Sequence, residues 1–384
     1  MKPELFQLTF SLLSNSDIKP VFFIASESEV FLAWGQSSEN ENAPRCCSRY
    51  FNASSHSDLL WSQFSSQNNF TPEHFVFLDH NGGIQTNTPN WYESKLFEPR
   101  PVIDHPENEI EDFENWKLYC HEIEKAILRG ELKKVVPART KTLTFSTKLK
   151  LNQKATFFQK LIDSLPPNAH LFAYRESTDL FMGASPELLF KIENNEITVP
   201  AIAGTRPNYA SQEMSQKMTN ELISSPKERQ EHQYVVDYIE NTLSSLGLHP
   251  TFSKTPEVLT LKTLQHLQTL IKAPLKDHNV SALTVLEQLH PTPATAGIPK
   301  QKALELINRY ENFSRGLYAS PLGYILPNGN ARFVVCLRSL LLKDQSAHLF
   351  AGAGFINTSN YESEWLETSQ KMQTMGQLFG KNSA

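Results

Sequence analysis

Cysteine is scarce in this sequence, with four residues in a chain of 384. Cys46 and Cys47 are neighbours, whereas Cys120 and Cys336 lie far apart, and no pair has the C-x-x-C spacing typical of a zinc site. Four cysteines are also too few to hold a fold of this size together by disulfides. We therefore expect reduced thiols, as in a cytoplasmic protein.

Long hydrophobic runs are lacking as well. No window approaches the roughly 18 consecutive apolar residues that a transmembrane helix needs. At the N-terminus polar residues interrupt the apolar ones, and the continuous apolar core and small-residue cleavage site of a signal peptide are missing. The sequence thus predicts a cytoplasmic protein with no membrane segment.

Charge of one sign does not dominate the chain. The formal net charge is -5, and no basic cluster is dense enough to bind nucleic acid by releasing counterions. A small anionic ligand would need a local basic pocket, because the overall field is mildly repulsive. The HExxH, GxSxG and P-loop motifs are absent too, which excludes zinc proteases, serine hydrolases and P-loop nucleotide hydrolases.

What the sequence contains is a mixture of strand and helix patterns. Before about residue 105, short apolar runs such as Phe22–Ala25 and Phe75–Leu78 alternate with polar loops. From Phe113 to Ile127, apolar residues recur at three- and four-residue intervals, which predicts a helix. Without regular βαβ alternation, the order of patterns predicts an α+β fold. Further strands are expected at 171–174, 188–192, 324–326, 333–342 and 348–351, and helices at 226–246, 300–310 and 363–379.

A β-rich run from Lys134 to Arg139 contains a proline. Pro137 cannot donate a hydrogen bond to a ladder, so we expect a bulge or a sheet edge at this point. Because side chains alternate along a strand, only one of Lys133 and Lys134 faces inward. A buried lysine is costly unless it is paired or has a chemical task, which makes this position a candidate for function.

Two pairs of glutamates have helical spacing. Glu228 and Glu231 are three residues apart, as are Glu364 and Glu367, and Lys371 follows Glu367 by four. Carboxylates without thiolate or imidazole neighbours suit a hard cation such as Mg²⁺. The same residues also have structural explanations, because the Ser-Pro-Lys-Glu run ending at Glu228 is a capping box and Glu367 can form a surface ion pair with Lys371. Spacing alone leaves both interpretations open.

Two glycine-containing segments follow apolar runs. Gly352-Ala353-Gly354 lacks the third glycine of a dinucleotide-binding motif and fits a close approach of the backbone to a ligand. Gly204-Thr205 offers a backbone N–H and a hydroxyl for the same purpose. Ordinary turns explain either segment equally well.

Taken together and in order, a series of segments resembles the chorismate-utilising enzymes. The resemblance implies a single large fold in which two packed antiparallel β-sheets are flanked by helices, with the active site in the cleft. Residues 1–105 would be a variable N-terminal part integrated into that fold, and residues 106–384 the chorismate-binding catalytic region. The resemblance runs from about residue 110 to 380 and rests on Lys134-Val-Val-Pro-Ala-Arg139, Gly183-Ala-Ser-Pro-Glu187-Leu, Ala203-Gly204-Thr205, Ser225-Pro-Lys-Glu228-Arg-Gln-Glu231-His, His290-Pro-Thr-Pro-Ala294, Arg338, Gly352-Ala-Gly354 and Glu364-Trp-Leu-Glu367-Thr-Ser-Gln-Lys371.

Three positions separate the reactions of this family. The resemblance implies that Lys134 activates water, whereas anthranilate synthases have glutamine at this position. Aminodeoxychorismate synthases have a nucleophilic lysine at the position where this chain has Ala203. Salicylate synthases have a threonine at the position where this chain has Ala294. Lysine, alanine and alanine are the pattern of the isochorismate synthases, which are isomerases. A water-activating lysine makes a glutaminase subunit unnecessary.

Several alternatives stay open at this point. The run Arg315-Gly-Leu-Tyr318 is most similar to the menaquinone-pathway branch, but siderophore and salicylate pathways also begin with isochorismate. Tyr318 and Leu337 also occur in salicylate synthases, so salicylate formation with loss of pyruvate is the first alternative. More distant ones are an anthranilate or aminodeoxychorismate synthase, a non-catalytic chorismate-binding protein and an unrelated Mg²⁺-dependent hydrolase.

The resemblance also implies catalytic roles for two residues. Lys134, as the free amine, takes a proton from the water that attacks ring carbon 2 of chorismate. Glu187, as the neutral acid, protonates the hydroxyl that leaves carbon 4. The acid role requires the pKa of a glutamate, ordinarily about 4.3, to be raised, which burial does.

Binding roles follow from the same resemblance. Mg²⁺ would be held by Glu231 and Glu367, with Glu228 and Glu364 supporting it through waters, and would bind the ring carboxylate. An arginine and a lysine would hold the carboxylates and the enolpyruvyl group, because a guanidinium grips a carboxylate bidentately. The predicted substrate-binding residues are Gly204, Thr205, His266, Ala294, Tyr318, Leu337, Arg338, Gly352 and Lys371.

The sequence departs from the family in two places. Pro137 stands where leucine is usual, so the strand that carries Lys134 is expected to bend. The segment before residue 105 lacks the tryptophan-sensing motif of anthranilate synthases.

Overall fold

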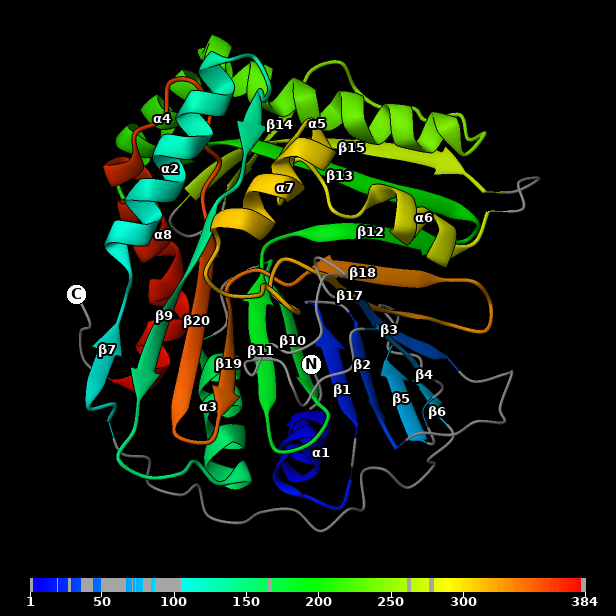
Figure 1. Cartoon of the computed structure of the whole chain (residues 1–384). Helices are drawn as coiled ribbons and strands as arrows, with labels where there is room; N and C mark the ends of the chain where they lie inside the picture. The colour runs from blue at the N-terminus through cyan, green and yellow to red at the C-terminus, as the bar shows by residue number, and fades with distance from the viewer. Residues whose placement is uncertain are drawn as a thin grey trace.

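Two antiparallel sheets form the centre of the molecule (Figure 1). The computed structural model describes residues 3–18, 20–26, 29–35, 44–49, 67–70, 72, 74–78, 84–86, 105–164, 168–260, 264–275 and 280–380. Within these residues the larger sheet has the strand order β6 (Ile84–Thr86), β5 (His74–Leu78), β2 (Val30–Trp34), β1 (Val21–Ala25), β10 (His170–Arg175), β11 (Leu180–Ser185), β19 (Ser339–Lys343), β20 (Ser346–Gly352), β9 (Ala138–Thr144) and β7 (Asn108–Ile110). The smaller sheet has the order β14 (Glu257–Thr260), β15 (Leu264–Pro274), β13 (Glu196–Pro207), β12 (Leu188–Glu193), β18 (Ala331–Val335), β17 (Pro321–Ile325), β3 (Arg45–Arg49) and β4 (Gln67–Phe70). A separate two-stranded ladder pairs β16 (Gly297–Ile298) with β8 (Lys134–Val135).

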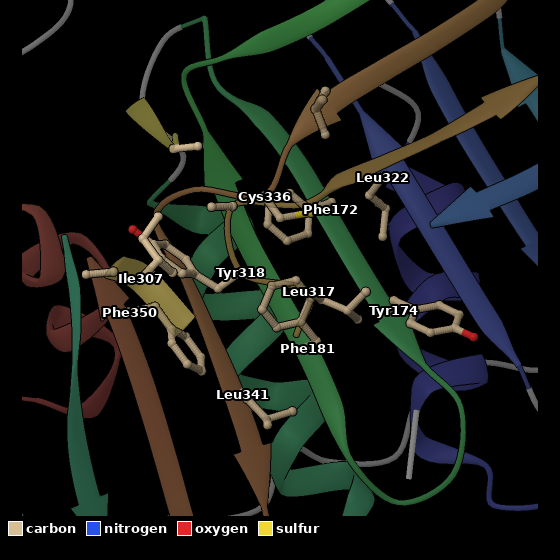
Figure 2. Close-up of a cluster of buried hydrophobic side chains, with 14 of the residues drawn as sticks. Phe172, Tyr174, Phe181, Ile307, Leu317, Tyr318, Leu322, Cys336, Leu341 and Phe350 are labelled. Atoms are coloured by element: carbon tan, nitrogen blue, oxygen red, sulfur yellow. The ribbon is translucent and has the colours of Figure 1, made fainter. Parts of the chain in front are cut away.

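The two sheets pack against each other through large apolar side chains. Along β1, Phe22 belongs to the cluster between the sheets, whereas its neighbour Phe23 belongs to the cluster on the outer face. This alternation follows from the two-residue period of a strand and explains why the strand is apolar throughout. Phe31 and Tyr324, one from each sheet, stack with ring centroids 4.6 Å apart. Figure 2 shows part of this inner cluster, including Tyr318.

Helices cover the outer faces of both sheets. The outer cluster of the larger sheet contains residues of α1 (Pro3–Ser14), α3 (Leu151–Asp163), α8 (Tyr361–Gly376) and the 3₁₀ helix Gln377–Phe379. The outer cluster of the smaller sheet contains residues of α5 (Pro226–Ser245) and α6 (Ala282–Leu289), and α4 (Gln212–Ser224) lies beside α5. Residues of α2 (Phe113–Leu128) and α7 (Lys300–Tyr310) pack into the inner cluster. No helix in the described ranges is both long and apolar enough to cross a membrane.

The α+β fold with two packed antiparallel sheets and flanking helices is confirmed. The expected strands at Phe22–Ala25 and Phe75–Leu78 and the helix from Phe113 are present as β1, β5 and α2. Strands from the N-terminal part enter both sheets. The division of the chain near residue 105 stays a prediction.

Two expected strands are broken in the structure. The run from Lys134 to Arg139 is split at Pro137 into β8 and β9, which belong to different sheets. The expected single strand at 333–342 was wrong, because the chain leaves the smaller sheet after β18 and enters the larger one at β19. Arg338, at this crossing, has a φ of +46°. A non-glycine residue in the left-handed region turns the chain out of the extended conformation, and apolar periodicity carries no sign of such a turn.

Candidate active site

A cavity of about 140 Å³ opens where the two sheets meet α5 and α8. Its walls come from β8, β13, β15 and β20, from the crossing between β18 and β19, and from both helices. Almost all residues predicted for catalysis and binding line it, drawn from positions 134 to 371. The lining includes Lys134, Glu187, Gly204, Thr205, Glu231, His266, Ala294, Tyr318, Leu337, Arg338, Gly352, Glu367 and Lys371. Glu228 and Glu364 lie outside it.

Lys134 faces inward from β8 and is 3% exposed, whereas Lys133 is exposed. The Lys134 Nζ atom lies 2.7 Å from Oε1 of Glu231, on α5. A Cβ atom added to Gly354 would lie 3.1 Å from Cε of Lys134. Glycine at this position therefore leaves room for the lysine side chain, and the expected approach of this backbone to a ligand stays a prediction.

Glu187 lies between β11 and β12, where the chain passes from one sheet to the other. Burial raises its pKa to about 7, although the positive charges of Lys134, Lys371 and Arg338 partly oppose the shift. The carboxyl is therefore substantially protonated near neutral pH. This is the direction that the predicted acid role requires.

A bulge in β13 forms one wall of the cavity. The register of β13 against β15 shifts between Ala203 and Thr205, and Gly204 at the bulge has a φ of +74°. His266 on β15 lies with Nδ1 3.2 Å from the Gly204 carbonyl oxygen and 3.1 Å from Oγ1 of Thr205. Burial lowers the pKa of His266 to about 4, so the ring is neutral. With Nδ1–H donated to the carbonyl, Nε2 is left as an acceptor.

Glu228 supports this wall from behind. Its carboxylate accepts a hydrogen bond from the Thr205 N–H at 2.9 Å and pairs with Arg206. The helix cap is made by Ser225, whose hydroxyl accepts from the Glu228 N–H. The capping prediction is thus right for the serine, while the glutamate side chain is turned toward β13.

Two further cationic side chains line the cavity, from the crossing after β18 and from α8. Within the described residues, the Arg338 guanidinium forms no ion pair and no hydrogen bond, and burial lowers its pKa. Lys371 Nζ lies 2.6 Å from Oε1 of Glu367 and donates to the Gly352 carbonyl at 2.9 Å. The predicted Glu367–Lys371 pair therefore forms, and it lines the cavity. A partly buried guanidinium without a partner is ready to bind an anion.

The rest of the lining is mostly apolar. Tyr318 stacks on Phe350 with ring centroids 5.4 Å apart. A Cβ atom at Gly352 would lie 3.0 Å from the Tyr318 hydroxyl and 2.9 Å from the Pro137 carbonyl oxygen, so this glycine also makes space for its neighbours. Ala294 and Leu337 complete this side.

The carboxylates of α5 and α8 influence one another. Burial and the nearby Glu367 carboxylate raise the pKa of Glu364 to about 7. Lys134 lowers the pKa of Glu231, and Lys371 lowers that of Glu367 against the effects of burial and of Glu231. Across the described part of the chain, no three His, Cys, Asp or Glu side chains converge into a preformed metal site. The carboxylates that repel one another are oxygen donors of the kind that Mg²⁺ prefers.

Sequence reasoning missed several lining residues. Thr295 and Phe350 are direct neighbours of predicted segments, so they could have been included. Leu259 lies on the edge strand β14, and nothing in its sequence context indicates a site. Arg206 follows the Gly204-Thr205 segment and was not singled out, although it pairs with Glu228.

Comparison with known proteins agrees with this geometry. Residues 85–380 match the family model described as chorismate binding enzyme, and the chain belongs to that family. An isochorismate synthase for salicylate biosynthesis from Pseudomonas aeruginosa is 38% identical over 208 residues, which cover 54% of this chain and 44% of the relative. Isochorismate synthase MenF of Bacillus subtilis is 32% identical over 269 residues, which cover 70% of this chain and 56% of the relative. Anthranilate synthase component 1 of Saccharolobus solfataricus is 34% identical, covering 56% and 51%. The chain thus matches about half the length of these relatives.

Solved structures show the same fold. The menaquinone-specific isochorismate synthase MenF of Escherichia coli superposes with a TM-score of 0.80 at 24% identity, covering 96% of this chain and 91% of the other. A putative 2,3-dihydroxybenzoate-specific isochorismate synthase of Bacillus anthracis gives 0.78 at 25% identity, covering 97% and 100%.

Proposed function

We propose that the protein is an isochorismate synthase, an isomerase that moves a hydroxyl group on the ring of chorismate. One observation carries the proposal. Lys134 and Glu187, whose pKa burial raises to about 7, face one cavity, which also contains the unpaired guanidinium of Arg338. An amine, a neutral acid and an anion-binding group are what water addition at one carbon and hydroxyl loss at another require. Sequence similarity to isochorismate synthases of three organisms supports the same reaction.

The reaction balances with these groups. The Lys134 amine accepts a proton from a water molecule while the oxygen of that water bonds to ring carbon 2. The two ring double bonds each move by one position, and the bond between carbon 4 and its hydroxyl breaks. Glu187 gives its proton to the departing oxygen, which leaves as water. The enzyme then returns to its starting state by proton exchange with solvent, and each group contributes about 10²–10⁴ in rate.

Binding of the substrate uses the cationic side chains of the cavity. Arg338 and Lys371 hold its carboxylates, and the backbone at Gly352 and Gly204 borders the enolpyruvyl group and ring. The neutral Nε2 atom of His266 accepts a hydrogen bond from a substrate hydroxyl. Mg²⁺, held by Glu231 and Glu367 with Glu228 and Glu364 in support, would neutralise the ring carboxylate.

Salicylate synthesis is the second candidate. Tyr318 and Leu337, which also occur in salicylate synthases, both line the cavity. This reaction begins with the same isomerisation and adds loss of pyruvate. Neither reaction consumes ammonia, so we propose that the enzyme acts without a glutaminase subunit. We also propose that it is a cytoplasmic enzyme. Menaquinone or siderophore synthesis would use the product.

Product separation tests the proposal. Purified protein incubated with chorismate and Mg²⁺ should form isochorismate, and chelation of Mg²⁺ should stop turnover until the metal is restored. Salicylate with equimolar pyruvate would favour the second candidate. An amino product that appears only with ammonia, or no consumption of chorismate at all, would contradict both.

A further inference from the structure

The backbone on either side of Pro137 is held by side chains. Pro137 separates β8, which carries Lys134, from β9 in the larger sheet. The Val136 carbonyl accepts a hydrogen bond from Nη2 of Arg315 at 2.7 Å, and the Ala138 N–H donates to Oε1 of Glu311 at 2.9 Å. Two side chains thus satisfy the groups that flank the break in the strand.

These two side chains form a buried ion pair. Glu311 and Arg315 are four residues apart in the segment after α7, and their side chains are 2% and 1% exposed. The contact is bidentate, with Arg315 Nε donating to Oε2 of Glu311 at 2.8 Å and Nη2 donating to Oε1. Arg315 Nη1 also donates to the Thr295 carbonyl at 2.8 Å. One guanidinium therefore joins three separate segments of the chain.

All three segments carry residues of the cavity. Lys134 precedes the break, Ala294 and Thr295 form another part of the wall, and Tyr318 follows Arg315 by three residues. A buried ion pair is by itself weak evidence of a stabilising role, because apolar replacements of such pairs are often as stable. What an apolar pair cannot do is bind the two carbonyls and the N–H in a fixed geometry.

We propose that Glu311 and Arg315 are positioning residues, which hold the Lys134 strand and the Ala294–Thr295 wall in register across the interruption at Pro137. Neither side chain lines the cavity, so both act through the backbone. The consequence for turnover rests on the proposed function, whereas the consequence for the backbone does not.

Arg315→Lys and Glu311→Gln test this inference. Lysine keeps the charge but has three donors on one nitrogen, so it cannot reproduce the planar fork that binds four oxygens. Glutamine keeps the shape of the glutamate without its charge. We expect kcat for chorismate consumption to fall about 100-fold in Arg315→Lys with little change in KM, since small misplacement of a reacting group has effects of this size. Amide hydrogen exchange at Val135 and Val136 should become faster, while that of β10 and β11 stays unchanged. Glu311→Gln should show the same fall in kcat and the same faster exchange. If Arg315→Lys does not fold, Glu311→Gln tests the inference by itself.

Lys154→Met is the matched control. Lys154 and Asp179 also form a buried pair, with side chains 1% and 0% exposed, at the end of β11 away from Glu187. Its loss should lower the thermal midpoint without changing kcat or the exchange of β8. If the Arg315 and Glu311 variants behave like this control, the pair is merely structural and the inference is overturned. If their β8 amides exchange faster while the wild type consumes no chorismate, the proposed function fails and the positioning role stands.

Discussion

The Lys134 Nζ atom and the Glu231 carboxylate lie 2.7 Å apart in the lining of the cavity. The contact gives a buried amine a partner, and it places a predicted base beside a predicted metal ligand. Glu187 faces the same cavity with a pKa raised to about 7 by burial. At the scale of single residues, two groups that face one cavity are therefore the candidates for proton transfer in opposite directions.

Lys134→Ala should lower kcat by about 10²–10⁴, because the attacking water loses its base. Chorismate should still bind, since Arg338 and Lys371 are untouched, and calorimetry would detect this. Lys133→Ala is the control: that side chain is exposed, and its removal should leave kcat unchanged. Retained activity in Lys134→Ala would move the base role to another group.

The Glu187 carboxyl predicts how turnover depends on pH. Because its pKa is raised to about 7, the proton it must donate is present below this pH and is lost as the pH rises through it. The kcat/KM profile, which reports the ligand-free enzyme, should therefore fall on its alkaline side with a midpoint near 7. Glu187→Gln should lower kcat by about 10²–10⁴ and remove this limb. An unchanged limb in the variant would assign it to a different residue.

At the scale of elements, the short ladder of β8 and β16 sets the position of Lys134. Gly297 on β16 pairs with Val135 on β8 and has a φ of +148°. A Cβ atom there would lie 2.2 Å from the Lys134 carbonyl oxygen and 2.8 Å from Cβ of Ala303 on α7. The ladder and helix can come this close only because the residue is glycine.

Gly297→Ala should lower the free energy of unfolding by about 2–5 kcal/mol, from backbone strain together with overpacking. Gly247→Ala provides the comparison, because Gly247 has a φ of +79° but no atom within 4 Å of the added Cβ. It should cost about 1–2 kcal/mol, from the left-handed backbone alone. Urea unfolding of both variants measures the difference, and equal losses would refute the close approach at β8.

At the scale of the whole molecule, the sheets bury all four cysteines as free thiols. Burial raises the pKa of each of them. The folded protein should therefore react slowly with a thiol reagent, and all four groups should react once denaturant unfolds the layers. Rapid reaction of one thiol under native conditions would indicate a local opening, and peptide mapping would identify it.

Much of this molecule could be predicted from its sequence. The apolar periods of β1 and α2 report local geometry and burial, so their positions were confirmed. The motifs that resemble the chorismate-utilising enzymes identified residues that line one cavity, although they are far apart in the chain. Interruptions between strands were harder to predict, because the apolar pattern of a run such as 333–342 is the same whether the run enters one sheet or two.

The sequence by itself determined the α+β pattern, the lack of disulfide and membrane-anchoring patterns, and the family. Each of these depends on residue type and local spacing. Only the tertiary structure decided that Lys134 pairs with Glu231, that Glu228 turns toward Arg206, and that Arg315 spans the break at Pro137. These contacts join segments that meet only when the sheets pack, and the packing selects among partners that local sequence leaves equally available.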